Sequence, residues 1–305
     1  MTEPRFSPPG KVIGILQPGY LPWLGFFEQL HASDIFVIYD DVQYDKHGWR
    51  NRNLIKTSQG PQWLTVPVLA NFSRRPLILQ VKVNNRENWR KKHLSSIRQN
   101  YAKAPFFNRY IDFFTEVYQR DWEYLIDLDL HLISNLAAFL GIDPGKIIRS
   151  STLELTGDRI TRLISICQKL GAATFYEGAS GRNYIDEATF RQQGIEVTYQ
   201  DYQHPGYRQL YGDFTPNLSI IDLLFNCRSG PGLGIPDSGA IRQRGRPCQR
   251  LCRQCPYRRC RLHQSGQPGS AGESLVRRDE FHLDQPAKYQ LQRRRRPGEK
   301  QRFPN

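Results

Sequence analysis

Polar side chains crowd into one short segment in the first fifth of the chain. The stretch "DDVQYDKHGWRNRN" holds carboxylates, amides, guanidinium groups and an indole within fourteen residues. Arginine forks bind phosphate or carboxylate in bidentate fashion, and asparagine pairs a donor with an acceptor for sugar hydroxyls or amides. A tryptophan face suits a sugar or a base, whereas a solvated loop needs no such mixture. The segment therefore predicts a substrate-binding site that contains Asp40, Gln43, Trp49, Arg50, Asn51, Arg52 and Asn53.

Two adjacent carboxylates, Asp40 and Asp41, open this segment directly after an apolar run. Such a pair can hold Mg²⁺ together with substrate phosphates. Alternatively, one carboxylate can act as a general base whose pKa is raised by the other. An Asx turn is the non-functional alternative. Because adjacent strand residues point to opposite faces, we expect one carboxylate to face the site, and we assign the general base to Asp41.

The loop "QPGYLPW" follows the first apolar run and precedes a helical pattern. α/β folds that bind nucleotides hold phosphates at this position. We therefore add Gln17 and Tyr20 to the predicted substrate-binding residues. The alternative is a rigid turn that packs Tyr20 and Trp23 into the core.

Two later segments supply further candidates. In "EGASGRNYID" the backbone amides near Ser180 and Arg182 can cradle an anion, although short Gly/Ser loops also serve as plain connections. In "DYQHP" the imidazole of His204 can act as a general base at neutral pH, or it can be structural. We predict Ser180 and Arg182 as substrate-binding residues and His204 as a second catalytic candidate.

The apolar pattern places these candidates at the ends of strands. Strands that alternate with helices predict an α/β fold with a mostly parallel, Rossmann-like sheet and flanking helices. In such sheets ligands bind beyond the carboxyl ends of the strands. The absence of Walker, G-x-G-x-x-G, G-x-S-x-G and H-E-x-x-H motifs disfavours the enzyme classes that they mark. The predicted strands are 12–16, 35–39, 63–68, 77–83, 174–176 and 195–199, and the predicted helices are 24–31, 87–101, 106–118, 124–140, 158–170, 187–193 and 219–225.

The net charge of +14 is concentrated in the C-terminal part of the chain. Residues 1–226 contain 25 Lys and Arg against 23 Asp and Glu, whereas residues 227–305 contain 18 against 6. The basic surface that is typical of a nucleic-acid-binding domain is therefore absent from the first part. We predict a flexible N-terminus over 1–11, an α/β domain over 12–226 and a disordered basic tail over 227–305.

The tail supports two interpretations. Cysteine and histidine spacings in it are compatible with zinc ligands, and its arginine runs would add affinity for phosphates. The favoured interpretation is out-of-frame translation of a GC-rich gene, because the Arg/Gly/Pro/Cys mixture begins in the middle of an element without a linker. The residues of the zinc alternative are Cys248, Cys252, Cys255, Cys260 and His263.

No signal peptide or membrane span is evident in the sequence. The N-terminal "MTEPRFSPPGK" lacks an apolar core, and no run approaches the ~18 apolar residues of a spanning helix. Cys167 is the only cysteine before Cys227, so the first part has no disulfide framework. We expect a cytoplasmic protein with no membrane span and make no assignment of its oligomeric state.

Seven collinear blocks between residues 12 and 226 resemble the WbqC-like protein family. They include "GILQPGYLPWLGFFEQL", "DIFVIYDDVQYDKHGWRNRNLIKT", "YEGASGRNYID" and "YQDYQHPGYRQLYGDFTPNLSIIDLLFN". Two positions depart from the family pattern: Gly19 stands where an asparagine is usual, and Arg228 follows F-N-C where a glycine is usual. The loop at 17–23 also resembles that of nucleotidylyltransferases, although both histidines of their motif are missing.

The resemblance implies a role in bacterial surface-polysaccharide assembly. It suggests a transferase that modifies an activated sugar in O-antigen (lipopolysaccharide) biosynthesis by transfer of an amino acid, an amide or a related group. Arg50 and Arg52 would hold phosphate or carboxylate, and Asp41 or His204 would deprotonate the acceptor. The substrate would be a small-molecule or lipid-linked sugar, with Mg²⁺ and a nucleotide-activated donor as candidate cofactors. The alternatives are a non-catalytic nucleotide- or carbohydrate-binding protein of an assembly complex and a nucleic-acid-binding protein with a zinc tail.

Overall fold

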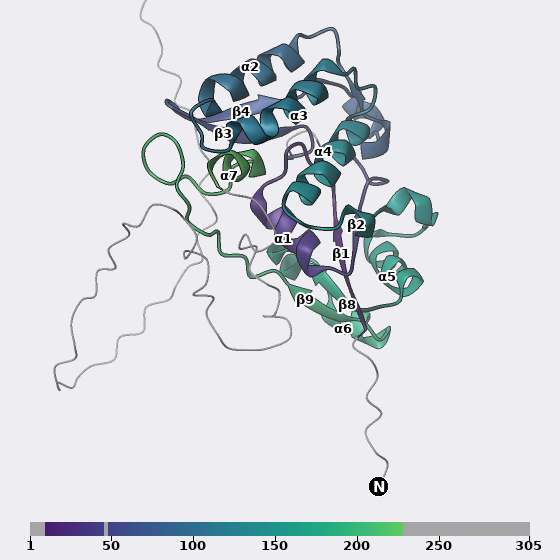
Figure 1. The fold of residues 1–305 in the computed structure, drawn as a ribbon. Helices are drawn as coiled ribbons and strands as arrows, with labels where there is room; N and C mark the ends of the chain where they lie inside the picture. Colours follow the sequence, from purple (N-terminus) through teal and green to yellow (C-terminus); the bar gives the residue numbers. More distant parts are fainter. Residues whose placement is uncertain (1–9, 46–47, 228–305) are drawn as a thin grey trace, which may run out of the picture. The chain divides into compact units, whose positions relative to one another are not determined.

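The computed structural model describes residues 10–45 and 48–227, all of which lie in one compact unit of the chain. A five-stranded, fully parallel sheet forms its centre, with the strand order β7-β2-β1-β8-β9 (Figure 1). Helices flank this sheet, so the predicted α/β fold class is confirmed. The strands are β1 (Lys11–Leu16), β2 (Ile35–Ile38), β7 (Ile147–Arg149), β8 (Ala172–Glu177) and β9 (Glu196–Tyr199).

The order of the strands reverses at β1. The chain passes from β1 to β2 on one side of the sheet and later returns to β8 on the other side of β1. In open α/β sheets the ligand crevice lies at such a switch point, beyond the carboxyl ends of the two strands. The crossover helices are α1 (Leu24–Ala32), α5 (Arg159–Leu170) and α6 (Glu187–Gln192).

A large insertion separates β2 from its neighbour β7. It contains two antiparallel two-stranded sheets and three helices, and helix α7 packs against it (Figure 1). Its elements are β3 (Arg52–Thr57), β4 (Gly60–Thr65), β5 (Val68–Leu69), β6 (Lys82–Val83), α2 (Trp89–Tyr101), α3 (Phe107–Gln119) and α4 (Leu125–Phe139), and α7 spans Ile220–Asn226.

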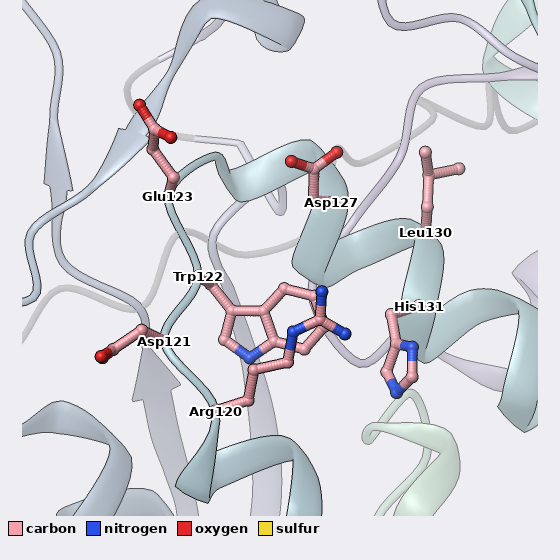
Figure 2. A pocket seen from close by; sticks show the side chains of 7 residues that line it. All are labelled: Arg120, Asp121, Trp122, Glu123, Asp127, Leu130 and His131. Carbon is pink, nitrogen blue, oxygen red and sulfur yellow. The ribbon is translucent and has the colours of Figure 1, made fainter.

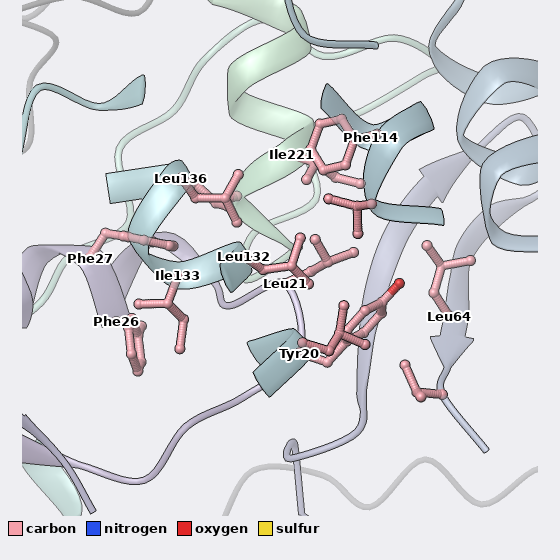
Figure 3. Close-up of a cluster of buried hydrophobic side chains, with 14 of the residues drawn as sticks. Tyr20, Leu21, Phe26, Phe27, Leu64, Phe114, Leu132, Ile133, Leu136 and Ile221 are labelled. Carbon is pink, nitrogen blue, oxygen red and sulfur yellow. The ribbon is translucent and has the colours of Figure 1, made fainter. Parts of the chain in front are cut away.

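Two hydrophobic cores cover the two faces of the sheet, because successive strand residues point to opposite faces. In β2, Phe36 and Ile38 contact the core built by α1, the insertion and α7, whereas Val37 contacts the core under α5 and α6. Figure 3 shows the first core, in which side chains of the loop after β1 meet those of α1, α3, α4 and α7. The fully buried residues of this core include Tyr20, Leu21, Phe27, Phe114, Leu132, Ile133, Leu136 and Ile221.

Some predicted elements differ from the structure. Strands β3 and β7 were not predicted, because "RNLIKT" lacks a clean alternation and β7 has only three residues. The strand expected at 63–68 runs instead from Gly60 to Thr65. The strand expected at 77–83 is a 3-10 turn, Ile78–Gln80, followed by the short β6. There Oε1 of Gln80 accepts a hydrogen bond from the Leu77 amide at 3.0 Å, which favours the turn over a ladder.

Most of the predicted tails cannot be compared with this fold. Residues 1–9 and 228–305 lie outside the described residues, and so do all the cysteines and the histidine of the zinc alternative. The proposed domain boundaries and the out-of-frame origin of the tail stay predictions. In the part of the chain that is described, no helix has the length and apolar character that a membrane crossing requires.

Candidate functional site

Four residues lie where β1, β2, β8 and β9 end, at the carboxyl edge of the sheet. Glu177 and Tyr199 end β8 and β9 and are register partners. Tyr39 follows β2, and its amide continues the ladder by donating to the carbonyl of Leu16 at 2.8 Å. The residues two positions earlier in β1, β2 and β8 are buried under α5 and α6. Because strand side chains alternate, Gln17, Tyr39, Glu177 and Tyr199 share the face that α5 and α6 cover.

Arginines from two other segments adjoin these four residues. Arg159 and Arg162 occupy the first turn of α5, and Arg182 lies in the 3-10 turn Ala179–Asn183 after β8. Each guanidinium lies over a tyrosine ring, at 3.6 Å from the ring centre of Tyr184, 5.4 Å from that of Tyr39 and 4.3 Å from that of Tyr199, respectively. We name the following residues the edge cluster: Gln17, Tyr39, Arg159, Arg162, Glu177, Arg182, Tyr184 and Tyr199.

Glu177 is the titratable centre of the edge cluster. Its side chain is buried, with the residue 5% exposed, and this burial raises the pKa of its carboxyl from 4.5 to about 7. The hydroxyl of Tyr184 donates to its Oε1 at 3.1 Å, and the positive charge of Arg159 also favours the ionised form. A Cβ at position 181 would lie 2.3 Å from its Cγ, so Gly181 leaves room for the carboxyl. Such a group takes up and releases a proton near neutral pH.

The predicted pair Asp40 and Asp41 is engaged by other side chains. Asp40 is fully buried and accepts hydrogen bonds from Nε of Arg149 at 2.6 Å and from the amide and hydroxyl of Ser151, each at 3.0 Å. Asp41 pairs with Nη2 of Arg162 at 2.5 Å. This pairing places Asp41 beside the edge cluster.

The surroundings of the two aspartates do not fit a magnesium ion. Mg²⁺ needs carboxylate oxygens that face the ion, whereas these oxygens face guanidinium and hydroxyl groups. Over residues 10–45 and 48–227, no three or more His, Cys, Asp or Glu side chains gather as a metal-binding group. A role for Mg²⁺ carried by the phosphates of a donor stays a prediction.

The segment "WRNRN" fastens the β3–β4 hairpin to the loop after β1. Nη1 of Arg50 donates to the carbonyl of Pro18 at 2.9 Å, and Nδ2 of Asn53 donates to that of Leu21 at 2.7 Å. Leu21 has φ +47° and precedes a proline, a combination that strains the backbone. Nδ2 of Asn51 donates within the hairpin segment itself, to the carbonyl of residue 66 at 2.8 Å. We name Arg50, Asn51 and Asn53 the hairpin clamp.

Tyr20 lies in the core beside this clamp. Its ring is fully buried, and its hydroxyl is hydrogen-bonded to Nδ1 of His93 at 2.9 Å and to the hydroxyl of Tyr118. Burial lowers the pKa of His93 to about 4, so its ring is neutral at pH 7. This placement favours the packing interpretation of the loop for Tyr20.

An aromatic pair marks the exposed part of the same hairpin. Trp49 and Trp63 are 47% and 43% exposed, and their ring centres are 5.1 Å apart. The guanidinium of Arg52 lies 4.7 Å from the ring centre of Trp63. Gln43 is also exposed and forms an isolated bridge with Leu77. Of the predicted binding residues in this segment, Gln43 and Trp49 are thus exposed, whereas Arg52 is partly buried.

His204 has a different environment from the other candidates. It is half-buried among the rings of Tyr202, Tyr207 and Phe214, and burial lowers its pKa. Among the interactions of the described residues, none joins His204 to Asp41. Ser180 is exposed and shares the 3-10 turn of Arg182, close to the edge cluster.

A surface hollow lies elsewhere, between the end of α3 and the first turns of α4. Figure 2 shows that its lining mixes acidic and basic side chains around the indole of Trp122. Asp121 pairs with Arg90, and Glu123 pairs with Lys82 at 2.8 Å, so these acids already have cationic partners. The lining residues are Arg120, Asp121, Trp122, Glu123, Asp127, Leu130 and His131, and none of them was a predicted site residue.

Several residues of the edge cluster were missed in the sequence. Tyr39 and Tyr184 carry no motif of their own. Two signals were nevertheless present: Glu177 stands between a strand and the glycine-containing loop, and Arg159 and Arg162 begin a helix, where acidic residues are favoured.

Comparison with known proteins identifies the family. The model of the WbqC-like protein family matches residues 17–230. The "Uncharacterized protein Rv1507c" of Mycobacterium tuberculosis is 38% identical over 218 residues, which cover 71% of this chain and 94% of that protein. No solved structure matches the chain. The matched range includes every residue of the edge cluster and the hairpin clamp, and the chain belongs to the WbqC-like protein family.

Proposed function

We propose that the protein is a transferase that modifies an activated sugar during the assembly of O-antigen or another bacterial surface polysaccharide. Family membership supports the biological context. The observation that carries the chemical part is Glu177, a buried carboxyl whose pKa is about 7, at the switch point of a parallel sheet and beside arginines. We place the reaction in the cytoplasm, with a small-molecule or lipid-linked sugar as the substrate.

The proposed step is a group transfer with Glu177 as the general base. An amine or hydroxyl of the acceptor gives its proton to the Glu177 carboxylate while the same nitrogen or oxygen forms the bond to the transferred group. The leaving group departs with the electron pair of the bond that breaks. Arg159 lies beside the carboxyl and would stabilise the negative charge that develops.

Asp41 and His204 remain candidates in this proposal with different roles. Asp41 would orient Arg162 through their 2.5 Å ion pair, as a positioning residue. His204 is held in an aromatic environment in which its ring is neutral at pH 7, and it would serve a base-catalysed step only if a substrate reached it. Gln17, on the face shared with Glu177, would bind a hydroxyl or an amide of the substrate.

Ligand-dependent stability is the direct test. The full chain is heated with nucleotides, nucleotide sugars and aminoacyl donors, with and without Mg²⁺. A ligand at about 100 times its Kd should stabilise the protein by ~2.7 kcal/mol. A donor found in this way is then assayed for turnover with the wild type, with Glu177→Gln and with the control Glu196→Gln, which is exposed at the opposite end of β9. Equal turnover by all three proteins would exclude Glu177 as the base.

A binding function is the second candidate, and the exposed Trp49–Trp63 pair favours it. Paired indole faces beside Arg52 suit a sugar ring or a base and need no chemistry. The protein would then be a carbohydrate- or nucleotide-binding member of an assembly complex. Ligand-induced quenching of tryptophan fluorescence, without turnover of any ligand that binds, would support this alternative over the transferase.

A further inference from the structure

We propose that Arg159 and Arg182 bind the diphosphate group of an activated sugar, one on each side of Glu177. The inference rests on the proposed function, because it names the substrate class of the same site. It differs from the sequence-based hypothesis, which assigned phosphate to Arg50 and Arg52.

The first argument is the availability of the two guanidinium groups. Arg50 is partly buried, donates to a backbone carbonyl and pairs with Asp45, and Arg162 pairs with Asp41. Arg159 and Arg182 are exposed, and within the described part of the chain neither forms an ion pair with a carboxylate. The positive charges of these two arginines, at one edge of the sheet, are thus not neutralised by a paired carboxylate and are available to an anionic ligand.

The second argument is that these two arginines are held in place. Their guanidinium groups lie 3.6 and 4.3 Å from the ring centres of Tyr184 and Tyr199. Contact with an aromatic ring fixes the guanidinium and still leaves N–H groups free to donate at its rim. Less side-chain entropy is then lost when an anion binds.

The third argument is that both pairs adjoin the same carboxyl. Tyr184, which Arg159 covers, donates a hydrogen bond to Glu177 at 3.1 Å. Tyr199, which Arg182 covers, is the register partner of Glu177 in the neighbouring strand. Two guanidinium groups whose tyrosines adjoin one carboxyl suit an anion with two phosphates, because each fork can bind one phosphate in bidentate fashion.

The backbone nearby leaves space for such a ligand. A Cβ built at Gly178 would have no heavy atom within 4 Å, and Ser180 in the next turn is exposed. The cations in the first turn of α5 also face the positive end of the helix dipole, which disfavours them until an anion binds. These features support the assignment but do not carry it without the two arginine–tyrosine pairs.

Binding of inorganic pyrophosphate to the full chain, measured by titration calorimetry, tests the proposal. We expect saturable binding, and we expect Arg159→Ala and Arg182→Ala each to weaken it about tenfold, which corresponds to ~1.4 kcal/mol. The matched control is Arg86→Ala, which removes the same charge at an exposed position of the insertion. Its affinity should equal that of the wild type.

No binding of pyrophosphate by the wild type, or an affinity of both alanine variants equal to that of the wild type, would overturn the proposal. Circular dichroism establishes that each variant is folded. If an alanine variant does not fold, Arg159→Lys and Arg182→Lys replace it, and each should still bind more weakly than the wild type because lysine lacks the planar fork. An affinity of the lysine variants equal to that of the wild type would also count against bidentate recognition.

Two further measurements are needed. The first distinguishes a nucleotide-linked from a lipid-linked diphosphate, and the second tests the diphosphate site independently of the proposed transferase activity. Tighter binding of UDP than of pyrophosphate indicates a nucleotide donor, whereas binding to phosphatidylcholine vesicles that contain a polyprenyl diphosphate indicates a lipid-linked sugar. Pyrophosphate binding that depends on both arginines, together with no turnover of any activated sugar, would keep the diphosphate site and overturn the transferase. Turnover that is insensitive to replacement of both arginines would keep the transferase and overturn the diphosphate site.

Discussion

The hairpin clamp and the edge cluster are both dense in polar side chains, but they use them differently. In the clamp, Arg50 and Asn53 donate to backbone carbonyls of the loop after β1. In the edge cluster, Arg159 and Arg182 lie over tyrosine rings at an exposed edge and form no ion pair among the described residues. The comparison shows that a crowded polar segment can serve the fold, whereas residues scattered along the chain can gather at one edge of the sheet.

Replacement of Glu177 should have the largest effect on turnover and should distinguish the edge cluster from the hairpin clamp. Glu177→Gln keeps the shape of the side chain but cannot accept a proton, so we expect turnover to fall about 10²- to 10⁴-fold. Steady-state kinetics with a donor identified by thermal stabilisation is the measurement. Asn53→Ala should leave turnover per folded molecule close to that of the wild type, and a comparable loss in that variant would remove the distinction.

The pH dependence of stability should show the burial of Glu177. Its pKa is about 7 in the folded protein and 4.5 in a free chain, so the folded state binds the proton more tightly. The contribution to stability is complete below about pH 4.5 and is lost as the pH rises through 7, a change of about 3 kcal/mol.

Urea unfolding of the wild type and of Glu177→Gln between pH 4.5 and 8 isolates this effect. Other buried carboxyls with a raised pKa, such as Glu28 and Asp222, are common to both proteins and cancel in the difference. The variant should gain stability relative to the wild type as the pH rises. A constant difference between the two proteins would mean that the carboxyl is not buried as described.

Loss of the clamp should lower stability rather than ligand binding. Asn53→Ala removes the donor to the carbonyl of Leu21 and leaves that buried group without its partner, so we expect a loss of about 2 kcal/mol. Asn183→Ala is the matched control, because Asn183 is exposed and its replacement should change stability by less than about 0.5 kcal/mol. The free energy of unfolding in urea gives both values, and pyrophosphate affinity should be unchanged in Asn53→Ala.

The smallest effect is expected for the exposed aromatic pair. A double-mutant cycle of Trp49→Ala and Trp63→Ala should give a coupling energy of about 1 kcal/mol or less, as for other aromatic pairs. Pyrophosphate affinity should not change, because the pair lies on the hairpin. A large loss of that affinity in either variant would mean that the hairpin and the edge cluster form one binding site.

The sheet could be predicted from the sequence because its strands are short, apolar and bounded by turn residues. Residues 12–16, 35–39 and 195–199 each correspond closely to an observed strand, whereas β7 has only three residues and no pattern of its own. The order of the strands could not be predicted, since nothing local to β8 specifies that it lies beside β1. The face shared by Gln17, Tyr39, Glu177 and Tyr199 depends on that order.

The site was harder to predict for a related reason. Hydrogen-bond partners decide whether a polar side chain is available, and the partners of Arg50 and Asn53 are carbonyls more than thirty residues away in the chain. The raised pKa of Glu177 likewise comes from burial, which no local pattern reports. Asp41, His204 and the other sequence-based assignments stay predictions until a ligand is found.

The position of α7 has a consequence for synthesis. The ring centres of Phe225 and Tyr101 are 5.1 Å apart, and Asp222 accepts a hydrogen bond from the hydroxyl of Tyr101 at 2.8 Å. Helix α7 therefore completes a core whose other residues come from much earlier in the chain. A ribosome adds these residues after every strand of the sheet. Translation that stops a few codons before Ser219 would release a chain with an open apolar core, the kind of species that chaperones and proteases retain.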